Sequence, residues 1–362
     1  MATDEGTYEY KLQHGDDFGR TYFRRFDGLA VSSLGLGSYL GDPTDAVDAR
    51  YRDAVATALE SGVNVVDTAI NYRNQRSERA VGKAIDDADV DRDAVFVATK
   101  GGFVPFDGER PENPGEYVTR EFVDSGLVAR EDLARGQHAI APDFLDDQLD
   151  RSLDNLAVDQ IDLYYVHNPE TQLHARSRED VYDQLEAAFT RLEERVADGD
   201  VGAYGVATWN AFRVAEGADD YLALPEVASR ARKAAKAAGN TATHLRAIQL
   251  PFNVFMADAF TAEVHEGPDG PQSALWFARE AGLNVFTSAS IAQGDLTGEI
   301  PADVSDQLQG DSPVQRAINF ARSAPGVTSA LVGMSRPEHV EENVAAGRFD
   351  PLGADAFDAV FE

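Results

Sequence analysis

Four polar residues with complementary chemistry follow short apolar segments of the chain. Asp67, Lys100 and His167 each end a run of β-branched, aromatic or small apolar residues, and Tyr72 lies in the loop after Asp67. Runs of this kind are typical of strands buried on both faces of a parallel sheet. The three strands would deliver a carboxylate, an amine and an imidazole at their carboxyl ends. A tyrosine beside a lysine is suited to general acid catalysis, because a nearby cation favours the phenolate and lowers the phenol's pKa.

The elements that must position these residues alternate between strand-like and helix-like segments, which predicts an α/β fold with parallel strands. Eight strand–helix units can be traced, and we expect them to close a (β/α)8 TIM barrel whose catalytic groups share the face at the carboxyl ends of the strands. The predicted pairs are Val31–Gly37 with Ala46–Glu60, Val63–Asp67 with Ser77–Asp86, Ala94–Thr99 with Pro142–Leu156, Ile161–His167 with Arg178–Asp198, Gly202–Thr208 with Pro225–Ala238, Ala247–Leu250 with Gln272–Ala281, Asn284–Ser288 with Pro313–Ser323, and Ser329–Val332 with Pro337–Ala346. We expect a single domain over residues 1–362, with the barrel at about 29–346.

The connections add a hairpin and several long loops to this plan. A hairpin is predicted over Thr21–Ser33, with Asp27-Gly28 at its turn. The connection Gly101–Ala141 is much longer than the ~2–6 residues usual between a strand and its helix. On a catalytic face it would be either a functional lid or a disordered surface insertion. The segments Trp209–Leu224 and Val254–Gly270 are also long, and because these loops shape the pocket, the sequence leaves the substrate open.

Composition indicates a folded protein and excludes several classes of partner. The 362 residues are 43% hydrophobic, and no apolar run approaches the roughly eighteen residues of a membrane span. The formal net charge of -31 disfavours nucleic acid and anionic membrane as partners. Cysteine is absent and the polar start lacks a signal-peptide core, so we expect a cytoplasmic protein without disulfides.

Lysine is rare in this chain. Only five of the 32 lysine and arginine residues are lysine, and one of them is Lys100 in an apolar strand. The acidic, lysine-poor composition resembles that of proteins from salt-in halophilic archaea. Considered singly, the site residues have ordinary explanations: Lys100 could extend from a strand end to water, Asp67 could cap a turn, and His167 could be structural. Their combination is what points to catalysis.

Further segments match one known pattern in the expected order. The segment Gly62–Gly82 carries the most specific motif, and the matches that follow are Ala98–Lys100, Ile161–His167, Ile248–Asn253 and Val332–Asn343. From about Leu29 to Asn343 the chain resembles the aldo-keto reductase family. The resemblance implies a (β/α)8 barrel without metal that binds NADP(H), or alternatively NAD(H). It also implies an oxidoreductase that reduces an aldehyde or ketone, or oxidises the alcohol, by hydride transfer.

The resemblance implies separate roles for the four residues. Tyr72 would protonate the carbonyl oxygen as hydride arrives from the nicotinamide. Lys100, paired with Asp67, would lower the phenol's pKa, and His167 would hydrogen-bond and orient the carbonyl. The set makes physical sense, since hydride transfer builds negative charge on oxygen, which a positioned proton donor removes.

Further positions are assigned to cofactor and substrate by the same resemblance. Gly37 and Ser38 would lie beside the nicotinamide ribose. The fifth strand carries Ala207-Thr208 where the family usually has Ser-Asn, so the carboxamide contact could come from Thr208, Gln249 or Asn210. The other implied contacts are Asp67, Ser288, Gly333, Ser335, Arg336, His339, Glu342 and Asn343 with the cofactor, and Tyr39, Phe103 and Trp209 with the substrate.

Two more positions depart from the usual family pattern. Ser288 stands where an aromatic residue commonly stacks on the nicotinamide. His339 stands where an arginine often contacts the 2′-phosphate, which leaves Arg336 as the main cationic candidate nearby. These changes bear on cofactor affinity and on the preference for NADPH over NADH.

Three alternatives compete with this interpretation. The glycines of Gly35–Gly41 differ from a dinucleotide fingerprint, because the third is one position late and Asp42-Pro43 interrupts the helix start. A metal-dependent hydrolase is disfavoured, since the seven histidines are scattered and none forms a His-x-His pair. The alternative that stays open is non-enzymatic: some barrels resembling this family act chiefly as cofactor-sensing regulatory subunits. The sequence leaves the oligomeric state open as well.

Overall fold

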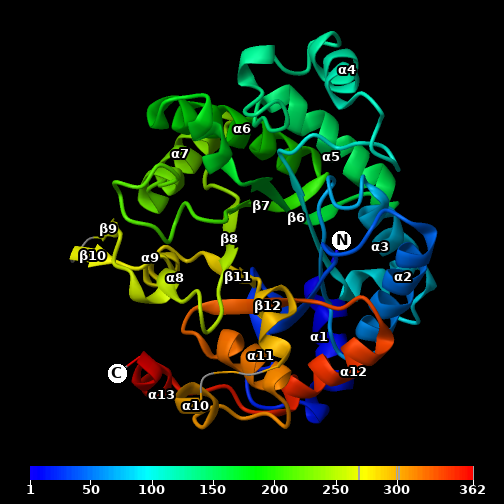
Figure 1. Cartoon of the computed structure of the whole chain (residues 1–362), viewed down its shortest axis with the longest axis vertical. Helices are drawn as coiled ribbons and strands as arrows, with labels where there is room; N and C mark the ends of the chain where they lie inside the picture. Colours follow the sequence, from blue (N-terminus) through cyan, green and yellow to red (C-terminus); the bar gives the residue numbers. More distant parts are fainter. Residues whose placement is uncertain (268–269, 299, 301, 362) are drawn as a thin grey trace.

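The computed structural model, which describes residues 1–267, 270–298, 300 and 302–361, confirms the predicted (β/α)8 barrel (Figure 1). Eight parallel strands close in the order β3, β4, β5, β6, β7, β8, β11, β12 and back to β3. Their bounds are β3 Leu34–Gly37, β4 Val65–Asp67, β5 Phe96–Gly101, β6 Ile161–His167, β7 Val201–Ala207, β8 Leu245–Pro251, β11 Asn284–Ser288 and β12 Val327–Gly333. Figure 1 shows the helices arranged around these strands.

The helices that follow the strands agree with the sequence pattern to within a few residues. Three of them, α5, α6 and α11, have the predicted bounds, and they begin after cap or proline signals. The helices are α1 Asp4–His14, α2 Asp45–Glu60, α3 Arg76–Asp87, α4 Pro114–Val118, α5 Pro142–Leu156, α6 Arg178–Asp198, α7 Leu224–Ala237, α8 Asp258–Thr261, α9 Ala274–Glu280, α10 Ala302–Ser305, α11 Pro313–Ser323, α12 Pro337–Ala345 and α13 Ala354–Asp358. Among the described residues, no helix has the length and apolar character needed to span a membrane.

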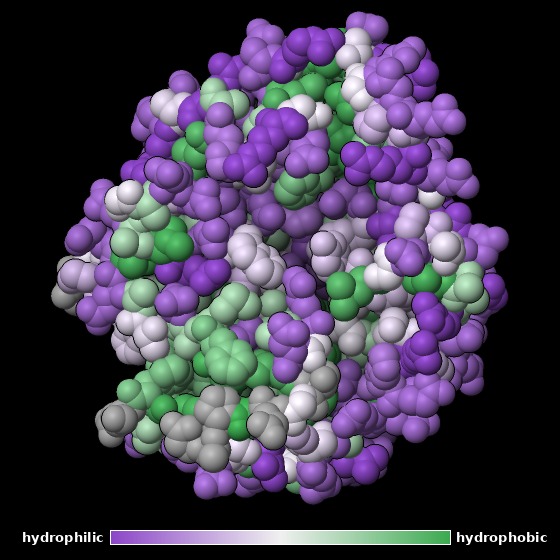
Figure 2. Space-filling view, viewed as in Figure 1, coloured by the Kyte–Doolittle hydropathy of each residue, from purple (hydrophilic) through white to green (hydrophobic). Residues whose placement is uncertain are grey.

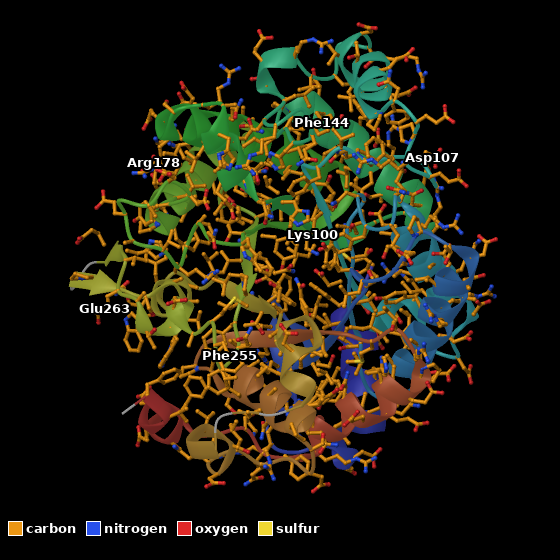
Figure 3. All side chains as sticks on the ribbon, in the orientation of Figure 1. Lys100, Asp107, Phe144, Arg178, Phe255 and Glu263 are labelled. Carbon is orange, nitrogen blue, oxygen red and sulfur yellow. The ribbon has the colours of Figure 1, made fainter. Side chains whose placement is uncertain are left out.

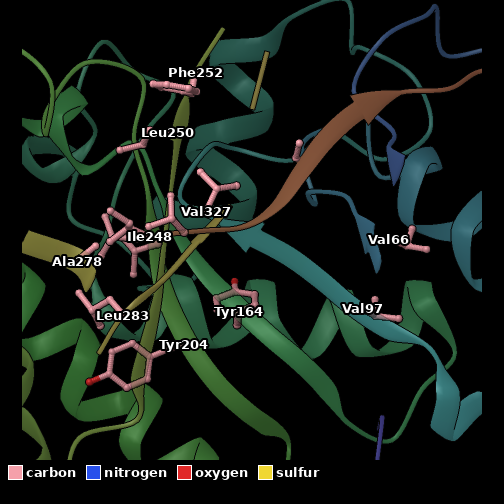
Figure 4. Packing of buried hydrophobic residues seen from close by; sticks show 14 of the residues in the cluster. Val66, Val97, Tyr164, Tyr204, Ile248, Leu250, Phe252, Ala278, Leu283 and Val327 are labelled. Atoms are coloured by element: carbon pink, nitrogen blue, oxygen red, sulfur yellow. The ribbon is translucent and has the colours of Figure 1, made fainter. Parts of the chain in front are cut away.

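Two cores result from the alternation of side chains along the strands. The larger core lies between the barrel and its helices, and Figure 4 shows part of it, including Tyr204, Ile248 and Leu250. The smaller core fills the barrel itself and includes Phe96, Tyr165 and other inward-facing side chains. The barrel is therefore a packed support for the residues at its open end rather than a channel.

The predicted strand Val31–Gly37 proves to be two strands. β2, Leu29–Ser32, pairs with β1, Phe23–Phe26, as the predicted hairpin, whereas β3 joins the barrel. The chain breaks there because Ser32 Oγ donates to the Leu34 carbonyl at 2.7 Å. The hairpin turn is confirmed, with left-handed φ values of 43° at Asp27 and 98° at Gly28. Phe26 from this hairpin packs edge-on against Phe96 in the barrel core.

The long insertion Gly101–Ala141 is folded, so a disordered insertion is the wrong alternative. It contains α4 and a π-helical turn at Thr119–Val123, and its apolar residues around Phe122 form a separate core with Phe144 of α5. The predicted helix at Gln272–Ala281 begins two positions later, because Gln272 belongs to a short hairpin formed by β9, His265–Gly267, and β10, Gly270–Gln272. The segment Val254–Gly270 includes residues 268–269, which lie outside the described residues.

Candidate active site

Alternation along the strands brings the predicted catalytic residues together. In β5, Ala98 packs in the barrel core and Val97 in the outer core. Lys100 therefore faces the inside of the barrel, and so do Asp67 and His167 at the ends of β4 and β6. Neighbouring parallel strands place these ends at one mouth of the barrel.

Lys100 and Asp67 form a buried ion pair at the bottom of this site. Lys100 Nζ donates to Asp67 Oδ1 at 2.5 Å and to the Thr68 carbonyl at 2.7 Å. Gln249 Nε2 donates to the other carboxylate oxygen, Oδ2, at 2.8 Å. Burial lowers the pKa of Lys100 and raises the pKa of Asp67, and in each case the partner's charge opposes the shift. Lys100 lies near the middle of the molecule, whereas Asp107 and Arg178 lie near its edge (Figure 3).

Tyr72 lies directly beside this pair. Lys100 Nζ is 5.1 Å from the centroid of the Tyr72 ring, and the Tyr39 ring packs against its other side at 4.9 Å. The pKa of the Tyr72 phenol is well above its ordinary value because of burial first, and then of Asp67 and Tyr39. This differs from the expected lowering by Lys100, since the ammonium points to Asp67 and Thr68. The phenol is thus protonated at neutral pH.

His167 completes the group as a neutral imidazole. Its ring centroid lies 6.0 Å from that of Tyr72 and 5.1 Å from that of Phe103. Burial, followed by the charge of Lys100, holds the pKa of His167 well below its usual range. Its Nδ1 atom is buried and accepts or donates no hydrogen bond among the described residues. A neutral imidazole can still donate one N–H to a carbonyl oxygen.

The insertion Gly101–Ala141 also contacts His167. His138 Nε2 donates to the His167 carbonyl at 2.7 Å, and its ring packs edge-on against Phe103 at 4.7 Å. Gln172 Nε2 lies 2.9 Å from His138 Nδ1, which fixes the tautomer that carries the proton on Nε2. The insertion therefore contributes to the geometry of the site as well as to its rim.

One cavity of about 710 Å³ joins nearly all the residues predicted for the site. Of those predicted residues, Lys100, Arg336 and the carboxamide candidate Asn210 are outside the lining. Lys100 lies beneath the floor, and Arg336 is exposed just before α12. The predicted residues that line the cavity are Gly37, Ser38, Tyr39, Asp67, Tyr72, Phe103, His167, Thr208, Trp209, Gln249, Ser288, Gly333, Ser335, His339, Glu342 and Asn343.

The structure separates the three candidates for the carboxamide contact. Thr208 and Gln249 line the cavity, whereas Asn210 does not. The Asn210 side chain is engaged by Asp220 and Arg213. Gln249 already donates to Asp67, while Thr208 Oγ1 is buried without a partner among the described residues.

Sequence reasoning missed the segment that follows β11 and forms one side of the cavity. Ala289, Ser290, Ile291, Gln293 and Gly294 all line it. Left-handed backbone occurs there at Ala289, φ 51°, and at Gln293, φ 55°. Residues of these types rarely adopt such values, so the local sequence carried no signal for this turn. Tyr51, Asn71 and Val314 were missed too, because they reach the cavity from a helix, a loop and a second helix.

Comparison with known proteins agrees with this geometry. The model of the aldo/keto reductase family matches residues 33–231. A Schizosaccharomyces pombe protein described as "Putative voltage-gated potassium channel subunit beta" is 25% identical, over 89% of this chain and 86% of that protein. The NADH-specific methylglyoxal reductase of Escherichia coli is 24% identical, over 91% and 93%. A solved aldo/keto reductase from Klebsiella pneumoniae, in complex with NADP and acetate, superimposes with a TM-score of 0.62 at 18% identity, covering 94% of each chain.

The closed parallel barrel carries a tyrosine, a histidine and a lysine–aspartate pair near its mouth, and the family match makes it an oxidoreductase barrel. Because the family model covers more than half of the sequence, this chain belongs to the aldo/keto reductase family. Within the described residues, histidine, aspartate and glutamate side chains form no group of three that could hold a metal ion.

Proposed function

We propose that this chain is an NAD(P)(H)-dependent oxidoreductase that reduces an aldehyde or ketone, or oxidises the corresponding alcohol, in the cavity at the barrel mouth. The observation that carries the proposal is the placement of the Lys100–Asp67 pair beneath Tyr72, with His167 on the same cavity. These groups offer one protonated phenol and one neutral imidazole to a single oxygen atom. Family membership supports the same chemistry.

The cavity suits a dinucleotide in size and in its unused polar groups. Thr208 lines the cavity, and its buried Oγ1 atom has no partner in the described structure. Ser335 lines the cavity just before α12, and Glu342 and Asn343 line it from within that helix. A helix start favours a phosphate through its free N–H groups and dipole, and Arg336 adds a cation there. We infer NADP(H) as the principal cofactor, a choice supported by the NADP-bound relative, with NAD(H) as the alternative raised by the NADH-specific one.

When bound, the nicotinamide supplies or accepts the hydride. The chain's own residues manage the proton and the developing charge. Tyr72 would donate its phenolic proton to the carbonyl oxygen, and His167 would hold that oxygen by a hydrogen bond. Lys100 holds its ammonium 5.1 Å from the centre of the Tyr72 ring, and Asp67 keeps that ammonium charged despite its burial. Because burial raises the pKa of the Tyr72 phenol, that side chain carries the proton that reduction of a carbonyl requires.

A second candidate function is a cofactor-sensing regulatory barrel with little turnover. The likeness to the Schizosaccharomyces pombe protein favours it, since that protein is described as a channel subunit. The two candidates differ in turnover rather than in cofactor binding. Cofactor retained through gel filtration without oxidation by any aldehyde would support the sensor.

The experiment that tests the proposal is turnover of purified protein in molar salt with NADPH or NADH and a panel of aldehydes. We expect turnover, and we expect Tyr72→Phe to reduce kcat at least about a hundredfold, because general acid catalysis typically contributes 10²–10⁴. The dissociation constant for NADPH should stay within about twofold, since the ring is kept. Tyr39→Phe is the matched control, because its ring packs on Tyr72 in the same cavity. Full activity in Tyr72→Phe would remove Tyr72 from the role of proton donor.

A further inference from the structure

A glutamate that the reaction does not use is buried behind the cavity wall. Glu170 lies three residues after His167, in the short 3-10 segment Pro169–His174, and only 5% of its surface is exposed. Its Oε1 atom accepts hydrogen bonds from the backbone amides of Trp209 at 2.7 Å and Asn210 at 3.1 Å. The Glu170 carboxylate, which follows β6, thereby holds the backbone just after the neighbouring strand, β7.

The two amides need this acceptor because the sheet ends just before them. The last ladder contact beyond β7 is Thr208 N to the Gln249 carbonyl at 2.8 Å. The next N–H groups, at Trp209 and Asn210, turn away from β8 and meet Glu170 instead. Buried N–H groups must find a partner, so the direction of the chain at this point depends on the carboxylate.

The held residues form one wall of the cavity. Thr208 and Trp209 both line it, and Thr208 supplies the unpartnered hydroxyl. From outside, Arg213 Nε donates to the Trp209 carbonyl at 2.8 Å, while Asp220 accepts from Asn210 Nδ2 at 2.9 Å. The short loop is thus fixed on the solvent side by side chains and on the buried side by Glu170.

We propose that Glu170 is a positioning residue that holds the Thr208–Trp209 wall in its binding geometry, and that this hold depends on the ionisation of its carboxyl group. The identity of the ligand, NAD(P)(H), rests on the proposed function. The position of the wall does not, because it follows from contacts within the chain.

Burial is the main reason that the Glu170 carboxyl ionises in the neutral range. Burial raises the pKa of the Glu170 carboxyl to about 7, against the backbone amides of Trp209, Asn210 and Glu170 itself, which lower it, and the nearby Asp220 charge raises it further. Other ionisable groups on the segments around it include His174 at the end of its own segment, Arg213 and Glu216 after β7, Arg178 on α6, His138 on the insertion, and His167 on β6. His138 and His167 stay neutral near pH 7, because burial lowers the pKa of each. Glu170 therefore changes charge in a pH range in which these two histidines stay neutral.

Loss of the charge weakens the hold. A carboxylate makes charge-assisted hydrogen bonds to both amides, whereas a carboxylic acid makes weaker, neutral ones. As pH falls through about 7, the wall should loosen and NADPH should bind less tightly, by roughly tenfold if one such bond is lost. In Glu170→Gln the amide oxygen can accept the same hydrogen bonds, and the side chain does not titrate.

The test uses the fluorescence of Trp209 to report on the Thr208–Trp209 wall. The chain has two tryptophans, and Trp276 is exposed on α9, so a Trp276→Phe background leaves Trp209 as the only one. We expect Trp209 fluorescence in that background to titrate with a midpoint near 7, the transition to disappear in Glu170→Gln, and the midpoint to fall in Asp220→Asn. The NADPH dissociation constant should rise about tenfold from pH 8 to pH 6 in the parent and stay constant in Glu170→Gln. Glu170→Leu should weaken NADPH binding at both pH values.

The outcomes separate this inference from the proposed function. An unchanged fluorescence transition in Glu170→Gln would overturn the inference, as would NADPH binding in Glu170→Leu that equals the parent at both pH values. Should Glu170→Leu fail to fold, Glu170→Gln and Asp220→Asn still decide the question. A normal Trp209 titration in a protein that binds neither NADPH nor NADH would support the positioning role and refute the proposed cofactor instead.

Discussion

Lys100 Nζ donates a 2.5 Å hydrogen bond to Asp67 Oδ1 inside the barrel, where the Lys100 side chain is fully buried. Neither charge could remain there alone, since an unpaired buried ion is costly. Gln249 donates to the other Asp67 oxygen, and the Thr68 carbonyl accepts a second hydrogen bond from Lys100. The pair therefore combines two requirements: it keeps a cation near Tyr72, and it makes the burial of that cation tolerable.

Lys100→Met should separate these two requirements. Asp67 would be left buried without its counter-charge, so we expect the free energy of unfolding to fall by roughly 3–5 kcal/mol. Urea unfolding at pH 7 measures this loss. In the double variant with Asp67→Asn the uncompensated charge is gone, so most of the stability should return while carbonyl reduction stays absent. Equal stability of Lys100→Met and the parent would contradict a charged pair.

His138 should make the protein less stable in acid. Burial lowers the pKa of His138 to about 4, below the ordinary 6.5 that it regains on unfolding. The unfolded chain then binds the extra proton between these values, so stability rises with pH in this window and is lost as pH falls from about 6.5 to about 4. In His138→Gln this contribution, ~3 kcal/mol across the window, should be missing from the pH dependence of unfolding.

The control for that experiment is His339→Gln. His339 is exposed at the cavity edge, whereas His138 is buried beside His167. The His339 variant should unfold with the parent's midpoint at pH 7, and a His138 variant that keeps the parent's pH profile would argue against a buried neutral histidine.

The sequence was sufficient for the barrel because its signals are local. Proline at the first turn marks the start of α5 and α11, and Ser177 begins α6 with a capping box. Such contacts are determined by residues that are close together in the sequence. In contrast, α1 and the β9–β10 hairpin were missed, because neither carries a strong periodic pattern. α1 is fixed by the Thr3 cap and by docking to the barrel, where Ala2 N donates to Asp162.

The sequence predicted which residues belong to the site better than it predicted the contacts between them. Strand-end positions were enough to collect Tyr72, His167 and Asp67 around one cavity. The bond from Gln249 to Asp67 joins residues 182 positions apart, and no local pattern encodes it. The same is true of Glu170, whose partners become visible only when β6 and β7 lie side by side. The catalytic roles themselves stay predictions until tested.

The acidic surface should make stability depend on salt. The formal net charge is -31, and Figure 2 shows hydrophilic residues over most of the visible face. Screening reduces repulsion among exposed carboxylates, so the thermal unfolding midpoint should rise as KCl increases from about 0.1 M to about 2 M. Choline chloride at equal ionic strength should give a similar rise if screening is the cause. A midpoint that does not move with either salt would count against the halophilic character inferred from composition.

The two tryptophans offer a matched test of the substrate wall. Trp209 lines the cavity and is 40% exposed, whereas Trp276 is 48% exposed on α9 and is not part of the lining. Trp209→Ala removes apolar surface from the pocket, so we expect KM for an aromatic aldehyde to rise roughly tenfold while kcat changes by less than about threefold. Trp276→Ala removes a similarly exposed ring and should leave both constants at the parent values. Steady-state kinetics at saturating NADPH measure the difference, and equal KM values in the two variants would show that Trp209 does not contact the substrate.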